Sequence, residues 1–401
     1  MPKIAFYHNH KEDIGHLLRT LRIIAAMKRL CPSVKISVFQ AGRPQPPFDK
    51  TPGIEWMRLP RPFFSRANCR VAPTIDPGVV RSRSRFLAAA LDRIVPDAFV
   101  TNFFPLGRRE CRLELAAVLK PLRDRGTKLF ACVPLPYFTH SSGQIDELLY
   151  FAGLYHKILI HTPPEVLTTM ARSVGIESRV SPKEFIEVFA KLKDRLQFVG
   201  YDGPDEEPSP SPTPPPAGKT ILVQRGGGWT SPGIITDSLR AKKLLDPRYT
   251  MLVAAGPATT SSEMRAFRRV IKTNRIRGVT LRRFLPALAE HVGRSALCVG
   301  TAGDVAYECL YHGRRCVLIP FIGGVGSRRA DQTCRAHSLR GLLGATVLDY
   351  DGLTPKSLAR AIEEQLAAKT EPERFGMTRP HWFGGCTRSA GIILSHAQAR
   401  R

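Results

Sequence analysis

A proline-rich segment in the middle of the chain limits its fold more than any other feature. Residues 204–218 read PDEEPSPSPTPPPAG, and because each proline removes an amide donor and fixes φ, this segment forms neither helix nor sheet. The 401 residues suffice for about two domains of ordinary size. We therefore expect a first domain over 1–203, a linker over 204–218 and a second domain over 219–375. The tail, 376–401, has a helical pattern and is expected to pack back across the domain boundary.

The two halves open with the same pattern, an apolar strand, a loop, an amphipathic helix and a second strand. These patterns cover 3–7, 17–30 and 34–39 in the first half, and 219–223, 233–245 and 249–254 in the second. Further buried strands are predicted at 98–101, 128–133, 157–161, 278–281, 296–300, 316–320 and 345–348. The chain is therefore predicted to be an α/β protein of two facing Rossmann-like domains with parallel sheets and right-handed crossovers. Such sheets bind ligands at the carboxyl ends of their strands.

The strongest candidate site is an apolar strand that ends in small residues and leads into a helix. The small residues are Gly300, Thr301, Ala302 and Gly303, and they leave the amides at the helix start open to a phosphate group. Glu308 follows about one turn into the helix, where its carboxylate can accept hydrogen bonds from two ribose hydroxyls. The alternative is an ordinary strand-to-helix turn with Glu308 on the surface.

A run of three glycines follows the first strand of the second half. Gly226, Gly227 and Gly228 cost backbone entropy that a plain turn does not need, so close approach to a ligand is the simplest explanation. Arg225 beside them is expected to neutralise a diphosphate. The run matches neither the dinucleotide-binding nor the P-loop pattern. The alternative is a loose loop that continues from the linker.

In the first half, Gly15 and His16 open the first helix, and Arg19 follows one turn later. We expect this end of the helix to face the acceptor. An imidazole titrates near neutral pH, so His16 suits a general base that takes a proton from an acceptor hydroxyl. The alternative is a capping or surface histidine.

Asp331 and Gln332 follow a second glycine-rich stretch and precede another helical pattern. Their side chains suit the hydroxyls of a donor sugar, as acceptor and donor of hydrogen bonds. The alternative is a helix N-cap with a first-turn glutamine.

Metal signals are weak, and no metal or other cofactor is expected. His8 and His10 alternate at a strand end but lack an evident third ligand. Asp349 and Asp351 form a D-x-D that leads into a helix start, which indicates a turn. The nine cysteines include no C-x-x-C pair and have mostly apolar neighbours, so they are expected to be buried free thiols.

The formal charge is +26, with 60 Lys and Arg against 34 Asp and Glu, and it implies an anionic partner. An acidic membrane surface and nucleotide phosphates are the favoured partners, and nucleic acid is not. Scattered arginines on a solvated surface are the alternative. No apolar stretch approaches the ~20 residues of a membrane-spanning helix, nor is a signal segment evident, so we expect a cytoplasmic protein, peripheral on the inner face of the membrane at most.

These motifs together resemble the GT-B glycosyltransferases, and in particular the group similar to the cell-wall enzyme that adds N-acetylglucosamine to a lipid-linked muramyl peptide. The resemblance covers most of the chain. It is carried by DIGHLLRTLR at 13–22, by the strand leading to Gly226–Gly228, and by GDVAYE at 303–308 with Asp331 and Gln332. The chain has Asn102-Phe103 where related predicted enzymes often carry Asp-His.

The resemblance implies that the helix start at Gly300–Gly303 holds the diphosphate of a UDP-sugar, that Glu308 binds ribose and that His16 is the base. It further implies a metal-independent, inverting transfer of a hexose-type sugar to an acceptor hydroxyl, either lipid-linked or on a small glycoside. Two rival functions are a nucleotide-sugar 2-epimerase of the same fold and a polyanion-binding protein without catalysis.

Overall fold

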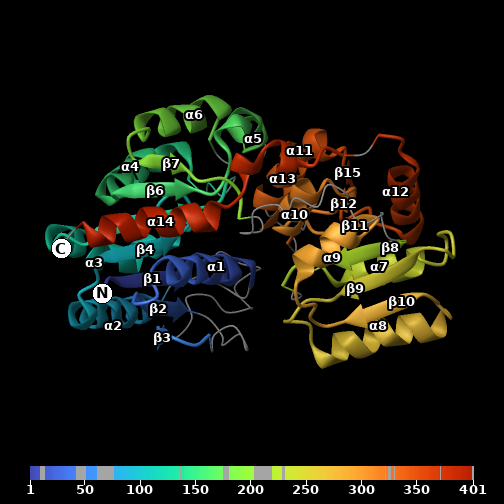
Figure 1. Ribbon diagram of the computed structural model, residues 1–401, viewed down its shortest axis with the longest axis horizontal. Helices are drawn as coiled ribbons and strands as arrows, with labels where there is room; N and C mark the ends of the chain where they lie inside the picture. The colour runs from blue at the N-terminus through green and yellow to red at the C-terminus, as the bar shows by residue number, and fades with distance from the viewer. Residues whose placement is uncertain are drawn as a thin grey trace. The chain divides into compact units, whose positions relative to one another are not determined.

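The computed structural model divides the chain into two compact units (Figure 1). The first unit contains Met1–Asp202 and Gly384–Arg401, and the second contains Gly203–Phe383. The structure describes residues 1–9, 14–41, 51–60, 76–135, 138, 140–174, 180–202, 219–227, 231–320, 322–323, 327–328, 330–370 and 372–399. Gly228, His10, Cys69 and the expected linker lie outside the described residues.

The first unit is built on a parallel sheet of seven strands in the order β3-β2-β1-β4-β5-β6-β7. The strands are β1 Lys3–Asn9, β2 Lys35–Ala41, β3 Ile54–Arg58, β4 Ala98–Asn102, β5 Lys128–Val133, β6 Lys157–Ile160 and β7 Leu196–Phe198. All five strands expected in this half are present, and β3 and β7 are additional. Both additional strands lie at sheet edges and are only partly buried, so they lack the continuous apolar run that marks a central strand.

Helices cover both faces of this sheet. They are α1 Ile14–Leu30, α2 Pro77–Ile94, α3 Arg112–Asp124, α4 Ile145–Leu154, α5 Leu167–Val174, α6 Pro182–Lys191 and α14 Gly385–Gln398. Side chains alternate across β1: Ile4 and Phe6 join the core under α1 and α14, whereas Tyr7 bonds to Glu114 of α3. On this second face Arg83 of α2 also binds Glu114, at 2.7 and 2.9 Å, and both side chains are fully buried.

The last helix returns to the first unit. Figure 1 shows α14 in red across the blue and green elements of this unit, and its residues Cys386, Ala390 and Ile393 belong to the core beside α1. The tail therefore divides at Phe383/Gly384, and only Gly384 and the residues after it join the first unit. Gly385 is required at the crossing, because a Cβ there would lie 2.3 Å from the carbonyl oxygen of Gly200.

The second unit has a parallel sheet of six strands in the order β10-β9-β8-β11-β12-β15, and a separate antiparallel pair, β13-β14. The strands are β8 Thr220–Gln224, β9 Thr250–Ala254, β10 Val279–Arg282, β11 Leu297–Gly300, β12 Cys316–Leu318, β13 Ile322–Gly323, β14 Ser327–Arg328 and β15 Thr346–Val347. The helices are α7 Pro232–Ala241, α8 Ser261–Thr273, α9 Leu288–Arg294, α10 Val305–His312, α11 Ala330–Leu343, α12 Pro355–Ala367 and α13 Phe375–Thr378. The predicted α/β class with two Rossmann-like parallel sheets is confirmed.

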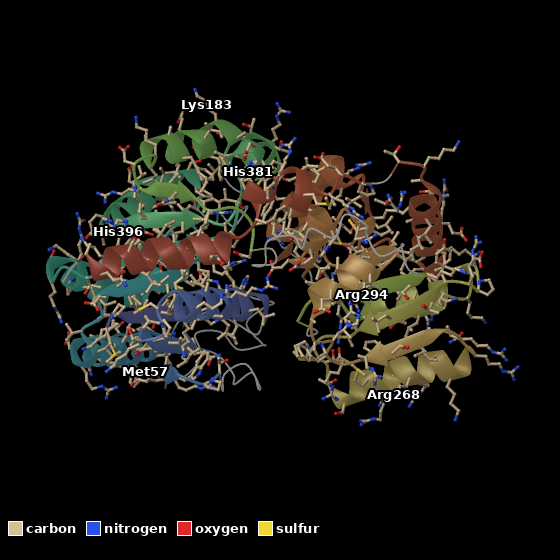
Figure 2. All side chains as sticks on the ribbon, in the orientation of Figure 1. Met57, Lys183, Arg268, Arg294, His381 and His396 are labelled. Atoms are coloured by element: carbon tan, nitrogen blue, oxygen red, sulfur yellow. The ribbon has the colours of Figure 1, made fainter. Side chains whose placement is uncertain are left out.

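The surface of both units carries long basic side chains. Lys183 on α6 and Arg268 on α8 extend outward from their helices (Figure 2). Eight cysteines within the described ranges are free thiols, and seven of them are buried, as expected. None of the helices in the described part of the chain combines the length and apolar character needed to cross a bilayer.

Candidate functional site

Both sheets reverse their strand order beside their first strand. β1 lies between β2 and β4, and β8 lies between β9 and β11. Open α/β sheets bind ligands at the carboxyl ends of strands where the strand order reverses in this way. Most residues predicted from the sequence lie at the end of β11 or after β1, β8 or β11, and Asp331 and Gln332 lie in the helix after β14.

In the second unit, the turns after β8 and β11 are bonded to each other. The side-chain amide of Gln224 donates to the carbonyl oxygen of Thr301 at 3.1 Å, and its oxygen accepts from the backbone N–H of Gly226 at 2.6 Å. Gly226 has a φ of +68° and is exposed, so this tight turn favours glycine. One glutamine thus joins two turns that are 77 residues apart in sequence.

The start of α10 is partly open. The first backbone bonds of this turn run from Ala306 to Gly303 at 3.1 Å and from Tyr307 to Asp304 at 2.9 Å, so the amides of 303–305 precede the intrahelical bonds. These three residues are half-exposed. Thr301 and Ala302 are instead 2% and 0% exposed, so the accessible part of the turn begins at Gly303 and not, as expected, at Gly300.

The two glycines of this turn serve different purposes. A Cβ on Gly300 would lie 2.1 Å from the carbonyl oxygen of Gln224, so glycine is needed there by the close packing of β8 and β11. Packing therefore accounts for Gly300, and its expected role toward a diphosphate stays a prediction. The nearest atom to a Cβ on Gly303 is Thr301 Oγ1 at 3.7 Å, an ordinary contact that leaves space above the backbone.

Arg335 of α11 stabilises the same turn by hydrogen bonds. Its guanidinium donates to the carbonyl oxygen of Ala302 at 2.5 Å and to the hydroxyl of Tyr307 at 2.8 Å, and it is 5% exposed. These bonds join α11 to the turn before α10 and to the first turn of α10 itself. Arg335 was not predicted, because its position inside a helical pattern carries no distinguishing signal.

The other donor-side candidates lie on these helices. Glu308 is in the first turn of α10 and is 5% exposed, and Gln332 in α11 is 8% exposed. Asp331 lies in the same helix, and its side chain is outside the described residues. Gly227 is buried, and its carbonyl oxygen accepts from Ala258 at 2.9 Å, which anchors the turn after β8.

Arg225 does not fit the predicted role. Its side chain is 1% exposed and donates to the carbonyl oxygen of Ala255 at 2.9 Å and to Thr259 Oγ1 at 3.0 Å. It also pairs with Glu263 at 3.1 Å and lies over the ring of Phe267. The charge expected to meet a diphosphate is therefore matched inside the unit, where it fixes the loop after β9.

In the first unit, His16 lies in the first turn of α1 and is half-buried. Its imidazole meets the ring of Phe103 edge-on, with 4.4 Å between centroids. Phe103 is fully buried and has a φ of +67°, an unusual conformation for a bulky residue that needs support from its surroundings. Gly15, the other residue predicted here, is half-buried at the same helix start.

A buried polar triplet lies under this helix start. Asn102 Nδ2 donates to Thr20 Oγ1 at 2.7 Å, and His8 Nδ1 lies 3.2 Å from Thr20 Oγ1 and 3.1 Å from Asn102 Nδ2. Thr20 also donates to the carbonyl oxygen of His16 at 3.2 Å. The triplet ties the ends of β1 and β4 to α1, and it gives His8 a hydrogen-bonding role.

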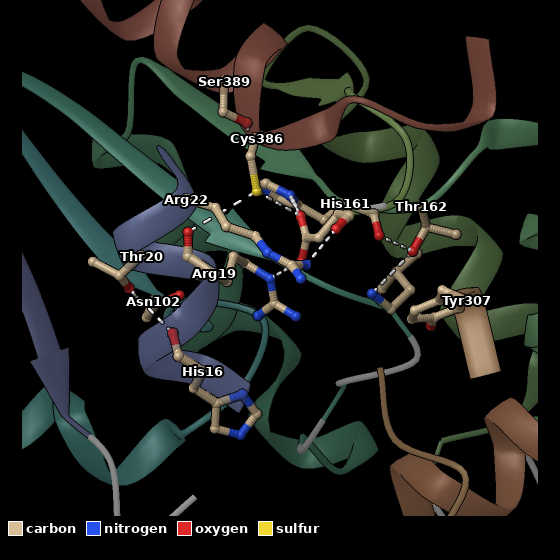
Figure 3. Close-up of polar contacts among 12 residues, drawn as sticks. His16, Arg19, Thr20, Arg22, Asn102, His161, Thr162, Tyr307, Cys386 and Ser389 are labelled. Carbon is tan, nitrogen blue, oxygen red and sulfur yellow. Dashed lines mark hydrogen bonds and ion pairs between the residues drawn. The ribbon is translucent and has the colours of Figure 1, made fainter. Parts of the chain in front are cut away.

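Arg19 belongs to a buried ion-pair cluster (Figure 3). Its Nε donates to the Asp202 carboxylate, which also binds His161 Nδ1 and lies 3.4 Å from Cys386 Sγ. Arg19 is 3% exposed, so its charge is directed into the unit and not, as predicted, toward an acceptor. Burial alone would raise the pKa of Asp202, but the charges of Arg19 and His161 and their hydrogen bonds hold it well below its usual value.

Within the described residues, His161, Asp202 and Cys386 form the one group with metal-ligand spacing, with ligand atoms within 4.8 Å of each other. Because the Asp202 carboxylate already pairs with Arg19 and His161, the arrangement is an ion-pair cluster. The D-x-D motif forms a turn, in which Asp351 donates its amide to Asp349 Oδ1 at 3.3 Å. The helix after it is capped by Thr354.

A cavity of about 250 Å³ opens further along the second sheet. It is lined by Pro320 after β12, by Thr333, His337 and Arg340 of α11, and by Val347, Leu348 and Asp349 at the end of β15. The carboxyl edge of this sheet is therefore hollowed beside β12 and β15.

The chain is similar to known proteins in its structure and not in its sequence. No protein-family model and no curated protein sequence matches the chain. The glycotransferase of kitacinnamycin superposes with a TM-score of 0.63 at 16% identity, over 99% of this chain and 100% of its own. The calicheamicin glycosyltransferase CalG4 gives 0.61 at 15%, over 99% and 98%, and MurG of Acinetobacter baumannii gives 0.58 at 13%, over 98% and 100%. The chain has the GT-B fold.

In this GT-B chain, the structure brings together a subset of the residues predicted from sequence. Gly226, Thr301, Gly303 and Glu308 gather at the carboxyl ends of β8 and β11. The residues that were not predicted are those that bond to or pack against the predicted ones: Gln224, Arg335, Thr20, Phe103 and Asp202. Of these, only Gln224 carried a readable signal, a polar residue at the end of an apolar strand directly before a glycine run.

Proposed function

We propose that this GT-B protein is a glycosyltransferase that moves a hexose-type sugar from a UDP-sugar to an acceptor hydroxyl with inversion. The observation that carries the proposal is the pair of bonded turns at the carboxyl ends of β8 and β11, with the amides of Gly303 and Val305 before the first bonds of α10. Amides at a helix start, together with the helix dipole, stabilise a phosphate group.

The donor half of the reaction is assigned to the second unit. A diphosphate at Gly303 would place its nucleoside within reach of α10, and Glu308 in the first turn of that helix would accept from the ribose hydroxyls. Gln332 and Asp331 at the start of α11 are proposed for the donor sugar. Solved structures of this fold support a uridine donor, since UGT71G1 of Medicago truncatula is complexed with UDP-glucose and matches with a TM-score of 0.60.

The acceptor half is assigned to the first unit. His16 takes the proton of the acceptor hydroxyl, whose oxygen then forms a bond to the anomeric carbon while the bond to the diphosphate breaks. The leaving diphosphate gains negative charge, and the α10 amides stabilise that charge. We propose no metal for this step, because the helix start supplies the positive end of a dipole at the leaving group.

An anionic membrane surface is proposed as a further partner. The charge of +26 attracts acidic lipid headgroups, and each basic side chain near such a surface contributes about 1 kcal/mol. Binding to vesicles of phosphatidylglycerol and phosphatidylcholine should fall steeply with salt. Equal binding to purely zwitterionic vesicles would remove this partner.

The function is tested first by a thermal-shift panel of UDP, GDP, ADP, dTDP and their sugars. A ligand at 100 times its Kd adds about 2.7 kcal/mol to the folded state, so UDP and a UDP-sugar should raise the Tm. The stabilising UDP-sugar is then incubated with lipid-linked and small glycoside acceptors, and without acceptor. Transfer that requires acceptor supports the proposal, whereas conversion of the donor to a sugar isomer without acceptor supports an epimerase. No stabilisation by any nucleotide would overturn the donor assignment.

A further inference from the structure

Asp202 is the point where three segments of the first unit meet. Its carboxylate binds Arg19 of α1 and His161 at the end of β6, and it lies 3.4 Å from Cys386 Sγ of α14. Its carbonyl oxygen accepts from Arg22 Nη1 at 2.7 Å. Two arginines of one helix thus converge on one residue, the last of the first unit before the chain crosses to the second. Figure 3 shows Arg19, Arg22, His161 and Cys386 gathered together.

Arg19 connects this cluster to the environment of His16. Its guanidinium carbon lies 5.8 Å from the centre of the Phe103 ring, and the same ring meets the His16 imidazole at 4.4 Å. Arg108 lies against Phe103 as well, at 4.8 Å. Phe103 is therefore held by two cations and presents an edge-on contact to the imidazole, a geometry that favours one orientation of both rings.

We propose that Asp202 is a positioning residue for the transfer reaction, and that it sets the orientation of His16 through Arg19 and Phe103. This inference rests on the proposed role of His16 as the base. An aligned base must lie within hydrogen-bond reach of the proton it removes, and a displacement of about 1 Å costs on the order of a hundredfold in rate. A neutral side chain at 202 leaves the buried Arg19 without its partner charge, so the guanidinium shifts or draws in water, and Phe103 loses one of its cations.

The same cluster contains an arrangement that resembles a nucleophilic triad. Asp202 binds His161 Nδ1, and His161 Nε2 lies 3.2 Å from Ser389 Oγ. Ser389 is 0% exposed, so no substrate reaches its hydroxyl and the arrangement is structural. Ser389 lies on the opposite side of His161 from Asp202, and Ser389→Ala is therefore a matched control that disturbs the cluster without removing the partner of Arg19.

The test compares Asp202→Asn with Ser389→Ala by two measurements. In protein labelled with 13C at histidine, Asp202→Asn should shift the His16 ring resonances and change their titration, while Ser389→Ala leaves them unchanged. In transfer assays, Asp202→Asn should lower kcat more than tenfold with the KM for donor within about threefold. Phe103→Leu keeps Asp202 and should also shift the His16 ring resonances. This variant provides the test if Asp202→Asn folds poorly. The inference is overturned if folded Asp202→Asn leaves the His16 resonances and their titration as in the parent; if that variant does not fold, it is overturned if Phe103→Leu leaves the His16 titration and kcat as in the parent.

A double-mutant comparison separates this inference from the proposed function. If Asp202 acts through His16, adding Asp202→Asn to His16→Ala should change the residual rate less than twofold. A further tenfold loss in that background would overturn the positioning role while leaving His16 as the base. Full transfer by His16→Ala would instead overturn the proposed base, and the resonance measurement would still decide whether Asp202 controls the His16 ring.

Discussion

Gln224 at the end of β8 donates its side-chain amide to the carbonyl oxygen of Thr301, directly after β11, at 3.1 Å. The same side chain accepts from Gly226 at 2.6 Å, so one residue sets the spacing of both turns. Gln224→Met keeps the shape and removes both bonds. We expect UDP affinity to fall about tenfold, equivalent to about 1.4 kcal/mol, as measured by calorimetry. Unchanged affinity would show that the spacing of the turns does not matter for the nucleotide.

Gly300 and Gly303 should respond differently to the same substitution. Gly300→Ala places a Cβ 2.1 Å from the Gln224 carbonyl oxygen, so β8 and β11 must separate and we expect a large loss of stability, with a Tm lower by several degrees. Gly303→Ala meets no atom closer than 3.7 Å, so the Tm should stay near that of the parent while nucleotide affinity falls. Equal nucleotide affinity for Gly303→Ala and the parent would place the diphosphate elsewhere.

Glu308→Gln should weaken nucleotide binding and leave the fold intact. The substitution removes a charge but keeps the size of a side chain that is 5% exposed, and charge-assisted bonds to ribose hydroxyls are about twice as strong as neutral ones. We expect roughly tenfold weaker binding of UDP by calorimetry. The matched control is 2′,3′-dideoxy-UDP, which should bind parent and variant equally. A loss of the same size for this ligand would assign Glu308 to another part of the nucleotide.

The buried pair of Arg83 and Glu114 should contribute far more to the unfolding free energy of the first unit than an exposed ion pair does. Both side chains are 0% exposed, and Glu114→Gln leaves the Arg83 charge buried without its partner. Breaking such a pair costs about 3–5 kcal/mol, to be measured by urea unfolding. The control is Asp124→Asn, which breaks the exposed pair of Lys120 with Asp124 at 2.7 Å and should have a much smaller effect. Similar losses in both variants would contradict this expectation.

Stability should fall with acid partly because of His140. Burial lowers the pKa of this side chain to about 4, whereas it is near 6.5 in the unfolded chain. Between these values the unfolded state binds the proton and the folded state does not. The contribution is therefore present in full above pH 6.5 and is lost as the pH falls to 4, by at most about 1.4 kcal/mol per pH unit. His140→Gln should show a flatter profile of unfolding free energy over this window, and a parallel profile would contradict the assignment.

The fold and part of the site follow from local patterns. Apolar runs such as Lys128–Val133 predict strands because a strand buried on both faces needs them, and glycines after the first strand of the second half predict a turn. That turn contains Gly226. The sequence also identifies Gly303 and Glu308, because a helix start after a buried strand has open amides wherever it occurs in sequence.

The tertiary structure decided which side chains are available and which are used inside the protein. From the sequence, Arg19 and Arg225 both resemble residues that bind an anionic ligand. In the structure both are buried against carboxylates, those of Asp202 and Glu263. Their partners are 183 and 38 residues away, and nothing local marks these pairings. The order of strands brings such residues together, because a buried charge is stable only beside an opposite charge and hydrogen-bonding groups, and that requirement is satisfied only when distant segments pack.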